Sequence, residues 1–188
     1  MKSLKTFRTV FSLLFLFILG AFLFIWIDRE LEFRKERAER PLPTGLHPIV
    51  ETKRDELISR SADIGIDIVI TDGFRSIDEQ DQLHQQGRSA DGSIVTYAEG
   101  GESYHNYGLA IDFALRLPDG AVIWDIERDG NGSGRPDWFE VADIGKELGF
   151  EWGGDWVRFK DYPHFQMDFG LSIRQLQEGY RPEDVIAD

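Results

Sequence analysis

The chain has 188 residues, no cysteine and a formal net charge of −13. Without cysteine, thiolate metal ligands and four-cysteine zinc sites are excluded, so His, Asp and Glu remain as the strong candidate ligands. Residues 46–188 hold 13 basic residues against 29 acidic ones, and so acidic a domain repels a phosphate backbone, which argues against nucleic acid as a partner and favours cationic ligands such as calcium.

An uninterrupted apolar run occupies the N-terminal part of the chain. From Val10 to Ile27 there is no charged residue, and a helix of that length spans about 27 Å, near the thickness of a membrane's hydrocarbon core. No small-x-small cleavage site follows the run, which predicts a retained single-pass membrane anchor rather than a cleaved signal peptide. More basic residues follow the run than precede it, which alone would place the C-terminus in the cytoplasm. The substrate inferred below lies outside, so we expect an extracytoplasmic domain.

The rest of the chain is predicted to fold as one α+β domain. A charged segment that ends at Pro41-Leu42-Pro43 separates it from the anchor, which gives an anchor and linker over 1–45, a main domain over 46–170 whose function is argued below, and a tail over 171–188. Apolar periodicity and turn signals predict helices and strands in alternation. The expected helices are 48–62, 77–86 and 138–148, and the expected strands 66–70, 109–117, 121–124 and 164–168. Short strands joined by tight turns favour an antiparallel sheet with flanking helices.

Two motifs hold the residue types that bind a hydrolytic metal ion. Asp112 lies seven positions after His105, and His164 follows Asp161 by three positions. A catalytic zinc needs three protein ligands of nitrogen and oxygen type, a fourth position for water, and a nearby base. We therefore expect His105, Asp112 and His164 to bind zinc and Asp161 to act as the base.

The surroundings of these residues favour a metal site over ordinary hydrogen-bonded histidines. Asp112 lies within an apolar run, where an ionised carboxylate is costly to bury unless a cation compensates it. Gly108 must let the chain bend before this run, and period-two alternation predicts that His164 points away from the packed side of its strand. A single histidine is more often an ordinary hydrogen-bonded residue, and we interpret His47 and His84 in that way.

The motif Ser-x-His-x-x-Gly-x-Ala-x-Asp at 103–112, with Asp-x-x-His at 161–164, resembles a known family of zinc peptidases. That family includes D-alanyl-D-alanine carboxypeptidases, D-Ala-D-Ala dipeptidases and phage endolysins. The resemblance runs from about residue 46 to 168, through GFRS, GGESYHNYGLAIDFA, EWGGDW and KDYPHFQM, and is strongest toward the peptidoglycan L-alanyl-D-glutamate peptidases. It implies the α+β fold that these peptidases share with hedgehog proteins. The dipeptidase branch has Glu and a Trp-His pair where this chain has Asp161 and Pro163-His164, which favours the endopeptidase side.

The resemblance also implies roles for individual residues. It assigns the zinc to His105, Asp112 and His164, and the catalytic base to Asp161. It places an oxyanion-stabilising arginine at Arg75, for which the alternative is an ordinary ion pair with a neighbouring aspartate.

Three further residues are candidates for contact with substrate. They are Ser103, Gln80 and Trp152. The alternatives are a turn-shaping role for Ser103, simple solvent exposure for Gln80 and burial in the core for Trp152.

A glycine-rich segment predicts a second, structural ion. Its oxygen-bearing residues match the ligand positions of a calcium loop, with glycine at the position of the sharp turn; they are Asp129, Asn131, Ser133, Asp137 and Glu140. A helix is expected after the loop but a strand before it, so this is half of an EF-hand. The alternative is a turn in which Asp137 caps the following helix.

These features together predict a monomeric zinc endopeptidase that hydrolyses the L-alanyl-D-glutamate bond of peptidoglycan stem peptides in the bacterial cell wall. One alternative is a D-alanyl-D-alanine carboxypeptidase or dipeptidase on the same scaffold, which would release D-alanine. Another is a non-catalytic wall-binding module, against which the presence of Asp161 and Arg75 argues.

Overall fold

The computed structural model describes residues 2–186, and the side chains of all of these except residues 2–10 and 12. The chain divides into two units, residues 1–40 and 41–188. The division lies close to the boundary expected at residue 45. The second unit, however, includes the segment from 171 onward that we expected to be a tail.

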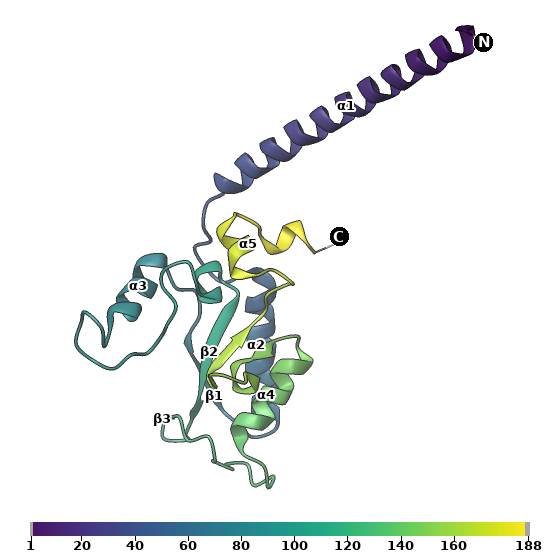
Figure 1. The fold of residues 1–188 in the computed structure, drawn as a ribbon. Coiled ribbons are helices and arrows are strands. Elements are labelled where there is room, and N and C mark those ends of the chain that lie inside the picture. The colour runs from purple at the N-terminus through teal and green to yellow at the C-terminus, as the bar shows by residue number, and fades with distance from the viewer. Residues whose placement is uncertain (1, 187–188) are drawn as a thin grey trace. The chain divides into compact units, whose positions relative to one another are not determined.

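The first unit is a single helix, α1 (Lys2–Ala38), which continues through the apolar run and the charged segment (Figure 1). Its large apolar side chains are exposed from Phe11 to Ile27. Within the described part of the chain, no helix combines the length and apolarity needed to cross a membrane. The predicted span over 10–27 is therefore not shown, and the side chains of Val10 and Ser12 lie outside the described ones.

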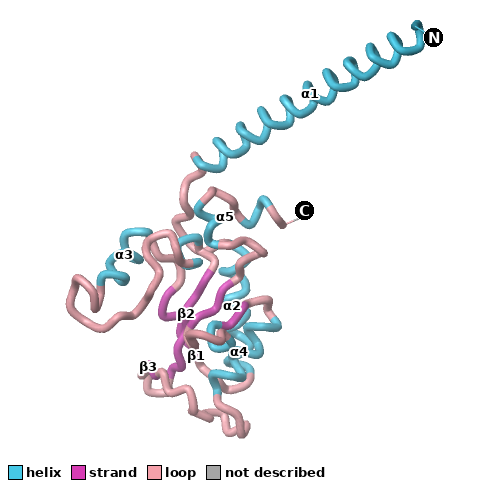
Figure 2. The backbone as a smooth tube through the Cα atoms, in the orientation of Figure 1, coloured by secondary structure: helices cyan, strands magenta, loops and turns pink. Residues whose placement is uncertain are grey.

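The second unit is built on an antiparallel sheet of short strands, as predicted. Four strands follow the order β1-β2-β5-β4, and β3 pairs with the part of β2 that β5 does not reach. The strands are β1 (Ile68–Asp72), β2 (Ala110–Arg116), β3 (Val122–Ile123), β4 (Glu151–Trp152) and β5 (His164–Gln166). Because β2 pairs with three other strands, its residues lie at the centre of the sheet (Figure 2).

Helices flank this sheet, and their starts follow the capping signals in the sequence. Pro48 occupies the first turn of α2, and the capping box of Ser76 and Glu79 starts α3. The α-helices of the second unit are α2 (Pro48–Asp63), α3 (Ile77–Gln85), α4 (Asp137–Glu147) and α5 (Ile173–Gln177). Short 3-10 helices are η1 (Tyr104–Tyr107), η2 (Gly153–Asp155) and η3 (Pro182–Asp184).

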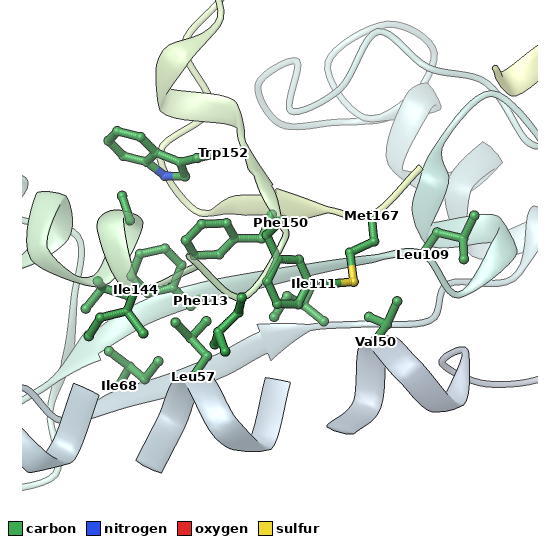
Figure 3. Close-up of a cluster of buried hydrophobic side chains, with 14 of the residues drawn as sticks. Val50, Leu57, Ile68, Leu109, Ile111, Phe113, Ile144, Phe150, Trp152 and Met167 are labelled. Atoms are coloured by element: carbon green, nitrogen blue, oxygen red, sulfur yellow. The ribbon is translucent and has the colours of Figure 1, made fainter. Parts of the chain in front are cut away.

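The hydrophobic core lies between the sheet and helices α2 and α4. Figure 3 shows Val50 and Leu57 of α2 pointing toward the sheet, where both are fully buried. The Phe113 ring of β2 stacks on Phe165 of β5 at 5.2 Å and lies 4.5 Å from the Trp138 ring of α4. Each fully buried side chain of this size stabilises the fold by about 1.5–3 kcal/mol, so the core fixes which face of the sheet is inside.

This core determines the orientation of the neighbouring polar residues. Successive side chains of a strand point to opposite faces. Since Ile111 and Phe113 of β2 belong to the core cluster, Asp112 between them faces the other side of the sheet. Phe165 of β5 is likewise in the core, so the adjacent His164 faces the same side as Asp112, as the sequence predicted.

The C-terminal segment is part of the folded unit rather than a tail. Leu171 and Leu176 are buried in the core cluster. The buried guanidinium of Arg181 donates hydrogen bonds to the carbonyls of Leu176 and Pro41, and it lies 5.5 Å from the Tyr107 ring. The segment therefore joins the first residues of this unit to its core.

Candidate metal centre

Three side chains form a compact group on the face of the sheet opposite the core. His105 Nε2, Asp112 Oδ1 and His164 Nδ1 are separated by 3.2 or 3.3 Å in each pair. Among the described residues, this is the one group of three or more His, Asp or Glu side chains whose ligand atoms all lie within 4.8 Å of one another. Ligand atoms of a tetrahedral zinc, at bond lengths near 2.05 Å, are about 3.3 Å apart. The donor set and its spacing therefore fit zinc.

Sheet register places two of the three donors side by side. Asp112 of β2 and His164 of β5 are direct partners in the antiparallel ladder, so their side chains leave the same face as neighbours. On the other side of β2, Asp72 of β1 is the partner of Asp112, just after an irregularity in the register. A slip of one residue would turn these polar side chains into the core, so the core packing also protects the site.

The third donor comes from η1, whose shape depends on its caps. The Ser103 hydroxyl accepts a hydrogen bond from the backbone N of His105 at 3.4 Å, and the Asn106 side chain accepts one from the backbone N of Ser103 at 3.3 Å. Gly108 ends the turn with φ of +68°, and a Cβ there would lie 2.2 Å from the carbonyl oxygen of Gly45. The bend expected at Gly108 is thus confirmed, and only glycine fits it.

The remaining ring nitrogen of each histidine has a hydrogen-bond acceptor. His105 Nδ1 donates to the Gly73 carbonyl at 2.6 Å, and His164 Nε2 donates to Gln166 Oε1 at 3.1 Å. Gln166 in turn donates to a Glu151 carboxylate oxygen at 3.0 Å, which orients its own oxygen toward His164. Since these partners hold the ring protons on the outer nitrogens, the inner nitrogens keep lone pairs for a metal ion.

The pKa values of the donors reflect their mutual contacts. Burial acts to raise the pKa of Asp112, but hydrogen bonds and charges from His105 and His164 outweigh it, so the pKa is lowered from its usual value. Burial acts to lower the pKa of His164, whereas the hydrogen bond and charge of Asp112 raise it above the usual value. Asp112 is therefore held in the ionised form that binds a cation.

Asp161 lies in the same cleft, in the turn that leads into β5. The backbone N of His164 donates to the Asp161 carbonyl at 3.2 Å. Gly153 packs against this turn so closely that a Cβ there would lie 2.5 Å from the same carbonyl oxygen. Burial raises the pKa of the Asp161 carboxyl, and the negative charge of Asp112 adds to this against the opposing charge of His164. A raised pKa brings a carboxylate closer to the range of an effective proton acceptor.

Arg75 is both an ion-pair partner and a cleft residue. Its guanidinium pairs with Asp72, and its Nη2 lies 3.8 Å from Asp112 Oδ2. Its Nη1 donates to Gln80 Oε1 at 2.8 Å, and Gln80 donates to the Ala98 carbonyl at 2.8 Å. Gln80 is fully buried and does not line the cleft. Gln80 therefore does not contact substrate as we expected. Its side-chain amide is buried, and its hydrogen bonds hold Arg75 in place.

A cleft of about 480 Å³ opens over the donors, and Ser103 and Asp161 line it as expected. Trp152 does not: it is buried in the core, and its indole N donates to the Tyr162 carbonyl at 2.8 Å. Trp156 lines the cleft instead, with its ring 5.2 Å from that of His164. Tyr97 and Phe159 also line the cleft, and the sequence did not single them out because they lie in irregular loops without a periodic pattern.

The predicted calcium loop keeps its oxygen atoms in internal hydrogen bonds. Asp129 accepts from the backbone N of Ser133 at 3.0 Å, and Glu140 accepts from the Ser133 hydroxyl at 2.8 Å. Asp137 accepts from the backbone N of Gly130 at 2.9 Å. The loop's acidic groups do not form one of the metal-binding groups found in the described residues. A calcium ion is not shown here and stays a prediction.

Known proteins resemble this chain across the site just described. A family model described as D-alanyl-D-alanine carboxypeptidase matches residues 96–167, which include all three donors and Asp161. The peptidoglycan L-alanyl-D-glutamate endopeptidase CwlK of Bacillus subtilis is 56% identical over 160 residues, covering 85% of this chain and 95% of that protein. The chain belongs to the same peptidase family as CwlK. The membership predicted from the sequence motifs is thus confirmed.

Two further proteins are less similar to this chain. An L-alanyl-D-glutamate peptidase of Listeria phage A118 is 31% identical over 114 residues, which cover 61% of this chain and 35% of the phage protein. Among solved structures, the L-Ala D-Glu endopeptidase ChiX of Serratia marcescens aligns with 26% identity and a TM-score of 0.46, over 71% of this chain and 85% of that one.

Proposed function

We propose that this protein is a zinc-dependent endopeptidase that hydrolyses the L-alanyl-D-glutamate bond of peptidoglycan stem peptides. The observation that carries the proposal is the 56% identity to an enzyme of that name over 95% of its length. The residues that such chemistry needs are also assembled in one cleft. The chain is therefore assigned as a metallopeptidase rather than as a wall-binding module.

The groups of the cleft divide the chemistry among them. A zinc ion held by the His-Asp-His donors would supply Lewis acidity and a nucleophile active near neutral pH. Asp161, with its raised pKa, accepts the proton of the attacking water and returns it to the departing amine of D-glutamate. Arg75, held by Asp72 and Gln80, stabilises the negative charge that develops on the carbonyl oxygen.

Digestion of purified peptidoglycan tests the proposal. The zinc-loaded protein is expected to release fragments with new N-terminal D-glutamate, identified by mass spectrometry and end-group analysis. Chelation and Asp161→Ala are each expected to abolish the release. Intact stem peptides after incubation with the zinc-loaded protein would remove the assignment.

A second candidate activity follows from the description of the family model. A D-alanyl-D-alanine carboxypeptidase would use the same donors but would remove the terminal residue of the stem. The same digestion separates the two activities, because free D-alanine appears only with the carboxypeptidase. Sacculi that bind the protein and release nothing would favour the wall-binding alternative.

We also propose that the enzyme acts outside the cytoplasmic membrane, as a monomer held at the membrane by α1. Support comes from the location of peptidoglycan and from the exposed apolar side chains of α1 between Phe11 and Ile27. Protease treatment of intact cells is expected to digest the peptidase unit, and carbonate extraction is expected to leave the full chain with the membranes. Recovery of the full chain in the soluble cytoplasmic fraction would contradict this placement.

A further inference from the structure

Two loops that line the cleft contact each other through aromatic rings. Tyr97 belongs to the loop between α3 and η1, and Phe159 belongs to the loop between η2 and β5. Their rings contact edge to face at 6.4 Å. Both residues line the same cleft as the metal donors.

These rings remain largely exposed in spite of their contact. Tyr97 is 72% exposed and Phe159 is 56% exposed. The guanidinium of Arg88 lies 5.5 Å from the Tyr97 ring and steadies it. Deeper in the cleft, the Trp156 ring lies next to His164. Exposed aromatic rings that line the same cleft as candidate catalytic groups are typical of a surface that binds a ligand.

The peptide chemistry does not require this surface. The donors, Asp161 and Arg75 account for attack on an amide, and none of those steps uses an aromatic ring. These rings are therefore free to contact another part of the substrate in the cleft that they line.

The composition of the proposed substrate identifies that part. In peptidoglycan, L-alanine is the first residue of the stem and is joined through a lactyl group to N-acetylmuramic acid. One residue and one lactyl group, at about 3.6 Å each when extended, thus separate the scissile carbonyl from the sugar ring. A sugar so close to the scissile bond has to lie in or at the rim of the same cleft.

We propose that Tyr97 and Phe159 form a subsite for the N-acetylmuramyl residue that carries the stem peptide. This inference rests on the proposed function and deepens it. The apolar C–H face of a pyranose ring packs on the face of an aromatic ring, while its hydroxyl groups stay in water. The subsite makes the enzyme prefer stem peptides that are attached to a sugar over free ones.

Paired substrates test the subsite. N-acetylmuramyl-L-alanyl-D-glutamyl-L-lysine and the same tripeptide without the sugar are compared by kcat/KM, with the full zinc-loaded chain. The unaltered protein is expected to prefer the sugar-bearing substrate. Tyr97→Ala and Phe159→Ala are each expected to lower kcat/KM for that substrate about tenfold, and to leave kcat/KM for the free tripeptide within about twofold.

Two control variants make the comparison specific. Val157→Ala alters an apolar residue of the Phe159 loop that is 97% exposed and does not line the cleft, so it is expected to change neither rate. Phe159→Tyr keeps an aromatic ring and is expected to retain the preference for the sugar. Melting temperatures of all variants are expected to match, because the altered side chains are exposed.

A binding measurement gives a second readout that does not depend on turnover. N-acetylmuramyl-L-alanine, the sugar-bearing product, is titrated into each protein. Its dissociation constant is expected to be about tenfold lower for the unaltered protein than for the Tyr97→Ala variant. Equal rates of the unaltered protein on the two substrates, or equal losses on both in the alanine variants, would overturn the subsite while leaving the endopeptidase intact. If neither substrate is cut, the proposed function itself fails.

Discussion

At the scale of single residues, the partner of His164 is as informative as His164 itself. Gln166 lies two positions further along the same strand and therefore on the same face, where its Oε1 accepts a hydrogen bond from the outer ring nitrogen of His164. Partners of this kind orient the ring and hold the tautomer that a metal needs. The site thus continues beyond the three donors into the strand itself.

Replacing this partner should weaken metal binding. Gln166→Leu is expected to lower zinc affinity about 10- to 100-fold, because the ring of His164 loses the acceptor that orients it. Competition with a chromophoric chelator measures the affinity. Gln85→Leu, at an exposed position of α3, serves as the matched control and should leave it unchanged. Equal zinc affinity in the Gln166→Leu and unaltered proteins would refute this role.

The Asp161 carboxylate is expected to be needed for activity and to lower the stability of the fold. Burial raises its pKa in the folded chain above the ordinary value of 3.8, so the folded state binds more protons than the unfolded state between these two pKa values. Stability therefore falls as the pH rises through this window, and the ionised carboxylate is a cost at pH 7. Asp161→Asn removes that cost.

The metal-free Asp161→Asn variant is accordingly expected to melt at pH 7 no lower than the unaltered protein, and its advantage should vanish below pH 3.8. Its peptidoglycan digestion should fall by at least about 100-fold, because the base is lost. Calorimetry and fragment release measure the two effects. A lower melting temperature at pH 7 would show that the carboxylate stabilises the fold instead.

The donors themselves were predictable, whereas several of their surroundings were not. His105, Asp112 and His164 stand in spaced motifs of ligand-type residues. The acceptor for His105 is the backbone carbonyl of Gly73, which no side-chain pattern can indicate. Gln80 was expected at the substrate because polar residues are mostly exposed, but its hydrogen bonds to Arg75 and Ala98 allow it to be buried.

At the scale of elements, helices and strands were predicted correctly where apolar residues recur with a regular period. Helices α2, α3 and α4 begin and end within two residues of the expected bounds, since caps and glycines mark them. Strand β4 and helix α5 were missed because two and five residues are too few to show a period.

Helix α5 should contribute to stability although the sequence suggested a tail. Leu176→Ala is expected to lower the free energy of unfolding by about 2–5 kcal/mol, because the side chain is buried in the core. Val185→Ala, at an exposed position, should change it little. Urea denaturation measures both variants. Equal unfolding midpoints would mean that the C-terminal segment is a dispensable tail after all.

The glycine-rich loop before α4 carries a prediction of its own. If calcium binds there, millimolar calcium should raise the melting temperature of the unaltered protein but not of Glu140→Ala, which loses the bidentate position of the loop. Asp143→Ala, a surface carboxylate on the following helix, is the control and should keep the calcium effect. No calcium-dependent rise in the unaltered protein would leave the loop as a hydrogen-bonded turn.

At the scale of the whole molecule, the two units are expected to fold independently of each other. The core, the candidate metal centre and the cleft all lie within residues 41–188. The general class of this unit could be predicted because antiparallel strands and helices alternate in its sequence. The shape of the cleft rim could not, because irregular loops depend on contacts distant in sequence.

A chain that begins at Pro41 should therefore fold and function alone. We expect it to keep the melting temperature of the peptidase unit and its rate on soluble muropeptides, while losing association with membranes. Calorimetry, kinetics and sedimentation with vesicles measure the three properties. Loss of the folded state on removal of residues 1–40 would show that α1 is required for the stability of the second unit.

The antiparallel pairing of Asp112 with His164 has a consequence for how such enzymes diversify. Two of the three donors are fixed by the backbone of the sheet, while Tyr97 and Phe159 are carried by loops outside the strands. Substitutions at these two rim positions can thus alter specificity while the pairing of the two donors stays intact. Placing the rim side chains of a carboxypeptidase on this sheet would test how far the two can be separated.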